Sequence, residues 1–582
     1  EAPTFANTIL ALERSGALLE WVSGSFYNLL HAEATDELMQ ISQEVSPELS
    51  ALSSFITLSE PLFERIRQVW EARESLQLDA EDLRLLERCY EGFSESGAQL
   101  PAEEKERLRE VKRELSELSL TFGQNNLKDQ QRFRLFVDDA AAVEVLPHST
   151  LAVARELAEK EGKGEGWLFT LSAPSYFPFM QHCPSGTLRQ EMYLAKMAVG
   201  AAGDAYDNRE LIHRLVNLRL ELAQLLGSKC FAEKVLARRM AGSTTAVYGL
   251  LDELLEAYKP LAEKELAAVA DFAREAGATL PLQPWDWSYW AERYKQTFYE
   301  LDEEELRPYF ELSRVSDAIF SLATRLYGIR FTERTDLPVY HSDVHTYEVH
   351  DADGSYLGLL YTDFFPREGK QSGAWMNNLQ EQYHTAEGED HRPHIVLVMN
   401  FTQPTADRPA LLTQGEVRTF LHEFGHSLHG MLSTCRHGSL SGTNVVRDFV
   451  ELPSQLMENW LDEREWLQSF AVHYQTGEAL PEVLMERMER ARHFLAGYAA
   501  CRQLSFGYLD MAWHTITEPL AEGLDTKTFE DTAWQKAQLL PATPAPCQMS
   551  TSFGHIFSGG YAAGYYGYKW AEVLDADAFA AF

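Results

Sequence analysis

Two histidines and a glutamate at the spacing His-Glu-x-x-His are the residues of this 582-residue chain best suited to chemistry; they are His422, Glu423 and His426. Residues four apart share a helix face, so the two imidazoles can bind one metal ion. Glu423, the next residue, lies beside that metal and can take a proton from a metal-bound water. The pattern predicts a zinc hydrolase. Two histidines on an ordinary helix face remain the alternative.

The segment around the motif predicts the helix that must position it. Apolar residues recur at helical spacing and would bury one side against a core. Gly425 lies between the histidines, where glycine costs about 1 kcal/mol of helix stability relative to alanine. We therefore expect another segment to approach the helix closely at this residue. The apolar residues are Val417, Leu421, Phe424, Leu428 and Met431.

A catalytic zinc usually has three protein ligands and one open position, so a third ligand is needed. Residues 448–460 predict a second helix with Pro453 in its first turn or at a kink. Glu451 and Glu458 are seven apart and share a face of a regular helix. One can bind the metal while the other holds a ligand histidine. Spacing alone does not assign the two roles, and two solvated acids on a surface helix are the alternative.

Three separated motifs resemble the M3 family of zinc oligopeptidases, the family of thimet oligopeptidase and neurolysin. They are His-Glu-Phe-Gly-His-Ser-Leu-His at 422–429, Ser-Gly-Thr-Asn with Asp-Phe-Val-Glu-Leu-Pro-Ser-Gln at 441–455, and a Gly- and Tyr-rich segment at 554–568. The resemblance implies one Zn²⁺ per chain and makes Glu451 its third ligand. Glu458 then holds a ligand histidine from behind.

The Gly- and Tyr-rich segment, residues 554–568, has a physical logic of its own. Its five glycines give backbone freedom, and Tyr561, Tyr565 and Tyr568 would stack on one face of a short helix. An aromatic core stripe is the alternative. A phenol or imidazole N–H can donate to the oxyanion that forms at a scissile carbonyl. The resemblance gives this role to Tyr561, with Tyr568 and His555, and makes the segment a substrate clamp.

A substrate-binding sheet edge is also expected. Residues 346–361 read as two strands around an Asp-Gly turn, and 394–399 as a further strand. Gly373 and Ala374 lie between them, next to Trp375. An extended peptide can pair with such an edge through its main chain. An ordinary edge strand with a buried Trp375 is the alternative. The resemblance favours peptide binding by Gly373, Ala374, Gly560 and the three tyrosines.

Two other groups of histidines are less suited to a metal. His341 and His345 flank Asp343 in a polar connector with no acid-rich partner nearby, so a loop is the better interpretation. His429 lies three residues beyond His426. A fourth protein ligand would close the site, so we expect His429 to be packed or hydrogen-bonded.

Composition excludes several classes of partner. Apolar residues make up 45% and charged residues 24%, as in a globular protein with a large core. The net charge of −37 argues against nucleic acid and against anionic membrane surfaces. No apolar run approaches the roughly 20 residues that span a bilayer. The six scattered cysteines favour free thiols in a reducing compartment. We expect a cytoplasmic monomer, with a periplasmic or exported location left open because the chain starts at Glu1 without methionine.

Helical patterning dominates the chain, notably at 103–125, 209–226 and 247–275. Breaks fall at 161–166, 280–284 and 541–546. The expected fold is mainly α, with a small β-sheet next to the zinc helix. The resemblance implies a neurolysin-like zincin with two helical lobes around a deep channel. We expect an N-terminal helical lobe at 1–165 and a catalytic region at 166–582. Relatives continue beyond Phe582, so the C-terminal end is expected to be truncated.

These observations predict a zinc metallopeptidase that hydrolyses short oligopeptides in a narrow channel. His422, His426 and Glu451 would hold the zinc, and Glu423 would move the proton from water to the leaving amine. Residues 447–451, after Ser-Gly-Thr-Asn, resemble the peptidyl-dipeptidase branch of the family, which releases C-terminal dipeptides, whereas Leu-Pro-Ser-Gln and Met-Glu-Asn-Trp resemble oligopeptidase A. The resemblance slightly favours the peptidyl-dipeptidase type. An endo-oligopeptidase of the oligopeptidase A type is the alternative, and a catalytically silent peptide-binding protein is the non-enzyme alternative.

Overall fold

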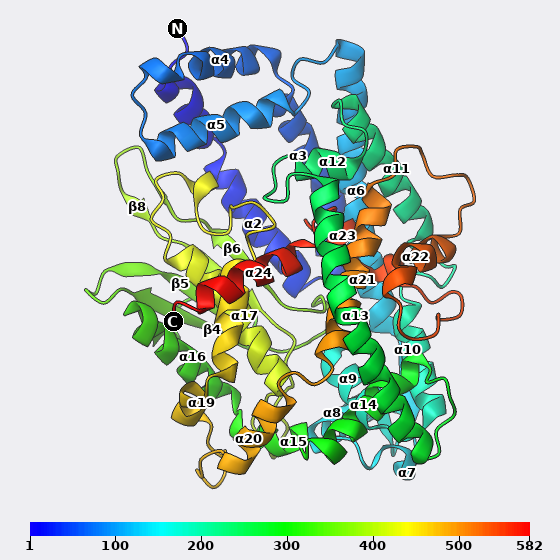
Figure 1. Ribbon diagram of the computed structural model, residues 1–582. Coiled ribbons are helices and arrows are strands. Elements are labelled where there is room, and N and C mark those ends of the chain that lie inside the picture. Colours follow the sequence, from blue (N-terminus) through cyan, green and yellow to red (C-terminus); the bar gives the residue numbers. More distant parts are fainter.

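The computed structural model describes residues 1–582 and is mainly helical, as the patterning predicts (Figure 1). The helices before the first long loop are α1 (Ala11–Glu13), α2 (Ala17–Ala32), α3 (Asp36–Thr57), α4 (Glu60–Glu71), α5 (Ala80–Ser94), α6 (Ala102–Arg132), α7 (Ala140–Val143) and α8 (His148–Lys160). Those that follow, up to the sheet, are α9 (Ala173–His182), α10 (Gly186–Met197), α11 (Arg209–Leu225), α12 (Phe231–Leu236), α13 (Thr244–Glu275), α14 (Pro284–Phe298), α15 (Glu303–Leu306) and α16 (Leu312–Tyr327). Those after the sheet are α17 (Gln414–Met431), α18 (Leu452–Glu458), α19 (Arg464–Phe470), α20 (Glu482–Ala491), α21 (Ala496–His514), α22 (Thr526–Trp534), α23 (Gly554–Phe557) and α24 (Gly567–Phe579).

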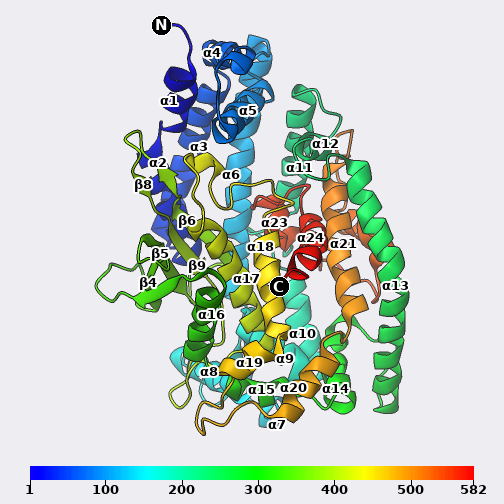
Figure 2. The ribbon, with the colours of Figure 1, turned by 60° about the vertical axis from the view of Figure 1, so that its left-hand side comes forward.

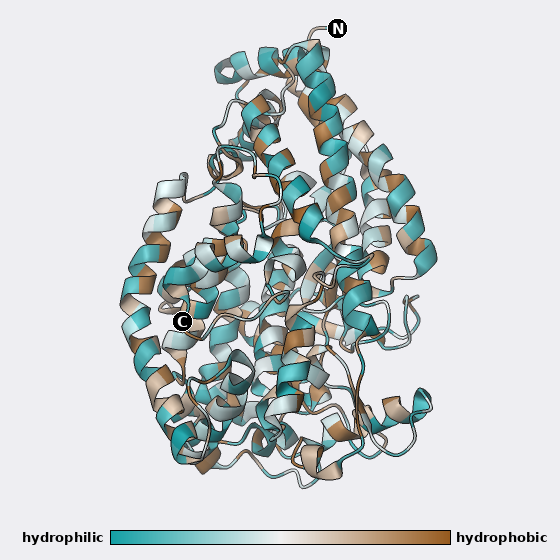
Figure 3. Cartoon of the chain, turned by 90° about the vertical axis from the view of Figure 1, so that its right-hand side faces the viewer, coloured by the Kyte–Doolittle hydropathy of each residue, from teal (hydrophilic) through white to brown (hydrophobic).

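The predicted helices are confirmed, with α6, α11 and α13 covering the three amphipathic stretches. Apolar and polar residues alternate along the long helices in Figure 3, as expected where one face of each helix is buried. The expected breaks at 161–166 and 541–546 lie outside helices and strands, and α14 begins at Pro284, where the third break ends. No helix combines the length and apolar character that crossing a bilayer requires.

A mixed five-stranded sheet has the order β3-β4-β5-β9-β6. The parallel pair β5 and β9 is at its centre, with Leu359 opposite His394, and β6 runs antiparallel to β9 at one edge. The predicted strands are confirmed, but His345 lies in β4 rather than in the expected connector. The bounds are β3 (Arg330–Glu333), β4 (Val344–His350), β5 (Tyr356–Asp363), β6 (Trp375–Gln380) and β9 (His394–Val398); two short pairs are β1 (Leu135–Val137) with β2 (Trp167–Phe169), and β7 (Tyr383–His384) with β8 (Asp390–His391).

The largest hydrophobic core lies between this sheet and helices α16, α17, α19 and α20. Phe420 and Phe424 of α17 pack into it with Phe320 of α16 and Ile395 and Leu397 of β9. Smaller cores hold α13 against α21, and α11 and α21 against the segment after α22. Figures 1 and 2 both show the sheet on one side of the molecule and α13 with α21 on the other.

Helix α2 packs on the edge strand β6, which joins the N-terminal helices to the sheet. A Cβ added to Gly24 would lie 3.5 Å from the carbonyl oxygen of Asn378, so the helix backbone lies directly against this edge. At the C-terminal end of α2, the guanidinium of Arg367 donates to Glu33 and to the buried carboxylate of Asp363. The N-terminal helices are thereby held at a fixed place along the sheet.

Candidate active site

Helix α17 is fixed at its start by a capping box. The Thr413 hydroxyl accepts the N–H of Glu416 at 3.0 Å, and the Glu416 carboxylate accepts the N–H of Thr413 at 2.8 Å. The same carboxylate accepts the N–H of Thr402, in the loop after β9, at 2.6 Å. These bonds satisfy N–H groups that a helix start leaves free. The expected apolar face is buried, since Val417, Leu421, Phe424, Leu428 and Met431 are at most 5% exposed.

The close approach expected at Gly425 is confirmed. A Cβ at this residue would lie 2.4 Å from the carbonyl oxygen of Pro453 and 2.6 Å from the Cα of Ser454. Helix α18 therefore crosses α17 backbone to backbone, and only glycine leaves room for it. Pro453 is in the first turn of α18, where its missing N–H costs no hydrogen bond. The crossing brings Glu451, the residue just before α18, beside the two histidines.

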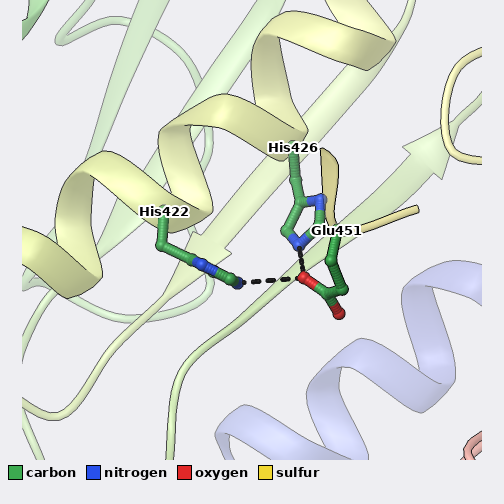
Figure 4. Close-up of side chains that lie close together, drawn as sticks. All are labelled: His422, His426 and Glu451. Carbon is green, nitrogen blue, oxygen red and sulfur yellow. Dashed lines mark ion pairs between the residues drawn. The ribbon is translucent and has the colours of Figure 1, made fainter. Parts of the chain in front are cut away.

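His422, His426 and Glu451 gather their side chains at one point (Figure 4). The Nε2 atoms of both histidines lie 3.2 Å from Oε2 of Glu451. No other group of three or more His, Cys, Asp or Glu side chains in the chain gathers its donor atoms in this way. Tetrahedral zinc with bonds of about 2.0–2.1 Å separates its ligand atoms by about 3.4 Å. Both nitrogen–oxygen separations are close to this value, so the three side chains are placed to hold one zinc ion.

Glu458 is the last residue of α18, whereas Glu451 comes just before its first. Glu458 contacts the other imidazole nitrogen of His422, Nδ1. Its Oε1 lies 2.7 Å from Nδ1 of the imidazole. When Nδ1–H donates to this carboxylate, Nε2 is the nitrogen left to bind a metal. The two acids that spacing could not tell apart thus lie on opposite sides of one histidine.

The charges of the site follow from these contacts. Burial opposes ionisation of Glu451, but hydrogen bonds to His422 and His426 hold its pKa well below the usual range. Burial likewise opposes protonation of His422, but its bonds to Glu451 and Glu458 raise its pKa. Glu423 differs, because burial raises the pKa of its carboxyl despite the neighbouring histidines. One buried acid is thus held ionised and suits a ligand, while the other is poised to accept a proton.

The tyrosines come together on the other side of the metal site. The Tyr561 hydroxyl donates to Oε1 of Glu451 at 2.5 Å, and its ring stacks on Tyr568 at 5.4 Å between centroids. The expectation that a helix stacks all three is only partly right, because α24 begins at Gly567. Tyr561 and Tyr565 come before this helix. His555 lies 5.8 Å from the Tyr561 ring. Burial raises the pKa of both Tyr561 and Tyr568, so these phenols stay protonated donors.

A cavity of about 750 Å³ opens onto these groups. The metal-site side chains, with Tyr561 and Tyr568, form one wall of this cavity. Gly373, Ala374, Gly560 and His555 also line it. Its other wall comes from the N-terminal helices, in particular from α2, α3 and α6. Sequence reasoning missed this wall, because nothing in its mixture of apolar, small and polar residues marks them for a metal site about 300 residues or more away. The residues from these helices are Tyr27, Leu30, His31, Met39, Ser46, Ser116, Ser119, Leu120, Gly123, Gln124 and Leu127.

The two other groups of histidines lie apart from the metal donors. His345 of β4 pairs with Glu333 of the edge strand β3 at 2.9 Å, where both side chains are half exposed, and His341 lies 3.7 Å from Asp343. His429 is on the metal-binding helix, where burial and then the charge of His426 lower its pKa to about 4. It stays neutral at ordinary pH and does not join the cluster of donors.

Comparisons with known proteins agree with this geometry. The family model of peptidase family M3 matches residues 179–582. The chain belongs to this family. The dipeptidyl carboxypeptidase of Escherichia coli strain K12 is 39% identical over 581 residues, which cover all of this chain and 85% of the relative. Oligopeptidase A of the same organism is 36% identical over 586 residues, with the same coverage.

Solved structures support the same fold for this M3 peptidase. A structure titled PZ peptidase A with inhibitor 2 matches with a TM-score of 0.54 and 14% identity, covering 98% of this chain and 83% of the other. With the metal site of His422, His426 and Glu451, the M3 peptidase is a metallopeptidase that acts on oligopeptides.

Proposed function

We propose that this metallopeptidase binds zinc and releases dipeptides from the C-terminus of short peptides. The observation that carries the proposal is Arg447. It is the only Lys or Arg side chain that lines the cavity, and no carboxylate lies within ion-pair distance of it. Its guanidinium is 5.0 Å from the Tyr561 ring and next to Gly560. A free cation this close to the metal site suits the C-terminal carboxylate of a peptide.

The proposed chemistry uses groups already in place. A zinc ion held by His422, His426 and Glu451 would lower the pKa of a coordinated water and polarise the scissile carbonyl. Glu423 takes the proton from the attacking water and delivers it to the leaving amine, which its raised pKa favours. Glu458 holds the Nδ1 proton of His422 and keeps that ring in its orientation.

The tyrosines supply the oxyanion donors in this proposal. Tyr561 already reaches the ligand Glu451, so its hydroxyl can turn to an oxygen that develops charge at the same place. Tyr568 stacks on the Tyr561 ring and limits its movement, and His555 borders the same space. One well-placed donor contributes about 3–4 kcal/mol to stabilising such a transition state. We assign this contribution to Tyr561.

The peptide backbone is proposed to pair with the part of the β6 edge that α2 leaves uncovered. Gly373 and Ala374 come just before this strand and line the cavity. Trp375 and Asn377, within the strand, line it as well. Main-chain pairing gives affinity with little preference for sequence. Tyr565 is buried behind Tyr568 and supports the clamp rather than touching the peptide.

The proposal is tested with one peptide made with a free and with an amidated C-terminus, and with the products read by mass spectrometry. We expect dipeptide release from the free peptide and at least tenfold slower cleavage of the amide. Replacing Arg447 by Gln should lower kcat/KM for the free peptide by about 10- to 150-fold, as loss of a charged hydrogen bond of about 1.5–3 kcal/mol implies. Arg447→Lys, which keeps the charge, is the control.

Other outcomes separate the alternatives. Equal cleavage of both peptides at internal bonds would contradict dipeptide release and favour endopeptidase action, which the 36% identity to oligopeptidase A keeps as the second candidate. Binding of peptide without any chelator-sensitive hydrolysis would identify a silent peptide-binding protein. We also propose a cytoplasmic location, because all six cysteines are free thiols.

A further inference from the structure

The segment that carries Tyr561 is exposed just before this residue and buried just after it. Ser558, Gly559 and Gly560 are exposed, whereas residues 563–567 are buried. Ala563 has a φ of +52° although it is not glycine. A left-handed conformation is unfavourable for alanine, so the surrounding structure must hold the chain in this turn. The turn begins two residues after Tyr561.

The carboxylate of Asp510, in α21, holds this turn. Its Oδ1 accepts the N–H of Ala563 at 2.8 Å, and its Oδ2 accepts the N–H groups of Gly564 and Tyr565, each at 2.9 Å. Asp510 is fully buried. Three successive N–H groups around one carboxylate make a concave anion site of the kind that fixes backbone conformation. An uncharged side chain of the same shape cannot accept all three bonds.

Two further buried residues connect Asp510 to the start of the segment. His514 lies with Nδ1 2.8 Å from Oδ1 of Asp510, and Nη1 of Arg219 lies 2.8 Å from its Nε2. Arg219 Nη1 also donates to the carbonyl oxygen of Ile556 at 2.7 Å. With Nδ1 protonated, His514 donates to the acid and accepts from the guanidinium. The network therefore grips the chain at 556 and at 563–565, on both sides of Tyr561.

A buried ion network of this kind is a weak source of stability, because desolvation offsets the attraction between its charges. Its contacts go to the backbone that brackets Tyr561, whereas none of its three members lines the cavity. The turn is also bonded to the segment that leads to the metal ligand Glu451. The Tyr566 hydroxyl donates to the buried carboxylate of Asp448 at 2.8 Å. The turn is thus fixed relative to the segment that bears Glu451.

We propose that Asp510, oriented by His514 and Arg219, is a positioning residue that holds the Tyr561 hydroxyl at the oxyanion. The proposal rests on the function proposed for Tyr561 and adds the device that fixes its place. It limits movement of the clamp to residues 558–560, and it assigns catalytic importance to a helix that does not touch the peptide.

The test is a double-mutant cycle between Asp510→Asn and Tyr561→Phe, measured by kcat and KM on the free peptide. Asp510→Asn should lower kcat by about 10- to 100-fold with KM changed less than about twofold, since misplacement by about 1 Å costs that much. In the Tyr561→Phe background the same substitution should lower kcat less than about threefold. An equal loss in both backgrounds would overturn the proposal, as would an unchanged kcat in Asp510→Asn.

A rescue and a second variant guard against a simple loss of folding. Adding Ala563→Gly to Asp510→Asn should recover kcat about fivefold or more, because glycine takes a positive φ without strain. If Asp510→Asn does not fold, His514→Gln enters the same cycle and should lower kcat only where Tyr561 is present. Failure of the rescue together with an additive cycle would leave Asp510 as a structural residue.

Glu530→Gln is the matched control. Glu530 is as buried as Asp510 and accepts the N–H groups of Met549 and Ser550, upstream of His555. We expect a lower melting temperature with unchanged kcat; an equal loss of kcat would show that any buried acid near this segment has the same effect. Failure of the proposed function is distinguished by Tyr561→Phe alone, because an unchanged kcat in that variant would remove the oxyanion role itself.

Discussion

Gly425→Ala is the most direct test of how the metal site is assembled. The new Cβ would lie 2.4 Å from the Pro453 oxygen and 2.6 Å from the Ser454 Cα. Ordinary contacts begin at 3.4 Å, so α18 must move by about 1 Å (3.4 minus 2.4) relative to α17. Both contacting atoms belong to the backbone, so no side chain can turn aside. Because Glu451 comes directly before α18, the third metal ligand moves with it.

Two opposing energies set the expected size of the effect. Alanine favours the helix by about 1 kcal/mol over glycine, while overpacking costs about 1–3 kcal/mol. We therefore expect a net loss of stability of up to about 2 kcal/mol. Activity should fall further, by about 100-fold, since a 1 Å displacement at a reacting site has that cost. The loss should appear in kcat/KM and in zinc affinity measured by competition with a chromophoric chelator.

The matched control is Gly415→Ala in the same helix. A Cβ at Gly415 meets only the Thr413 hydroxyl oxygen, at an ordinary 3.7 Å. This variant should keep full activity and match or exceed the wild-type melting temperature. The reasoning is refuted if Gly425→Ala keeps wild-type kcat/KM and zinc affinity.

Three further predictions concern single side chains. Glu423→Gln should abolish peptide hydrolysis, because it removes the proton acceptor, while zinc content by atomic absorption stays at one per chain; near-normal activity would contradict this role. Glu458→Gln should weaken zinc binding by about 10- to 100-fold, because it alters the partner of His422 Nδ1, and an unchanged affinity would refute it. Burial raises the pKa of Glu381 from 4.5 to about 7, so the folded state binds this proton more tightly than the unfolded state. That stabilisation is full below pH 4.5 and is lost as pH rises through about 7. Glu381→Gln should therefore flatten the fall in melting temperature over this range, and parallel curves for the two proteins would refute the assignment.

The sequence was most informative where the determining contacts are local. The spacing of His422 and His426 and of the apolar residues around them predicted their helix. The glycine between the two histidines predicted that another segment packs closely against it. Spacing could not show which acid of the neighbouring segment binds the metal, because Glu451 and Glu458 share a face of a regular helix. Only the family resemblance assigned them, and the crossing of α17 and α18 gives the physical reason.

The remaining parts of the site depend on contacts between distant segments. His31 reaches the cavity through the packing of α2 on β6, which no local pattern encodes. Asp510 left a faint signal, since an acid four residues before a histidine stands in an apolar stretch of α21. Such an acid must find a partner when it is buried. Its partners are the backbone N–H groups of Ala563, Gly564 and Tyr565, and sequence alone does not name them.

The packing of α2 on β6 also bears on how this protein avoids association with itself. An uncovered edge strand is a ready template for another chain, and folded proteins must block it. The backbone of α2 at Gly24 blocks the edge from Asn378 onward, and the rest of the edge faces the cavity of about 750 Å³. A space of that size admits a single extended strand but not the edge of a second folded sheet. The strand can therefore offer its hydrogen bonds to a peptide without exposing the protein to sheet-to-sheet aggregation.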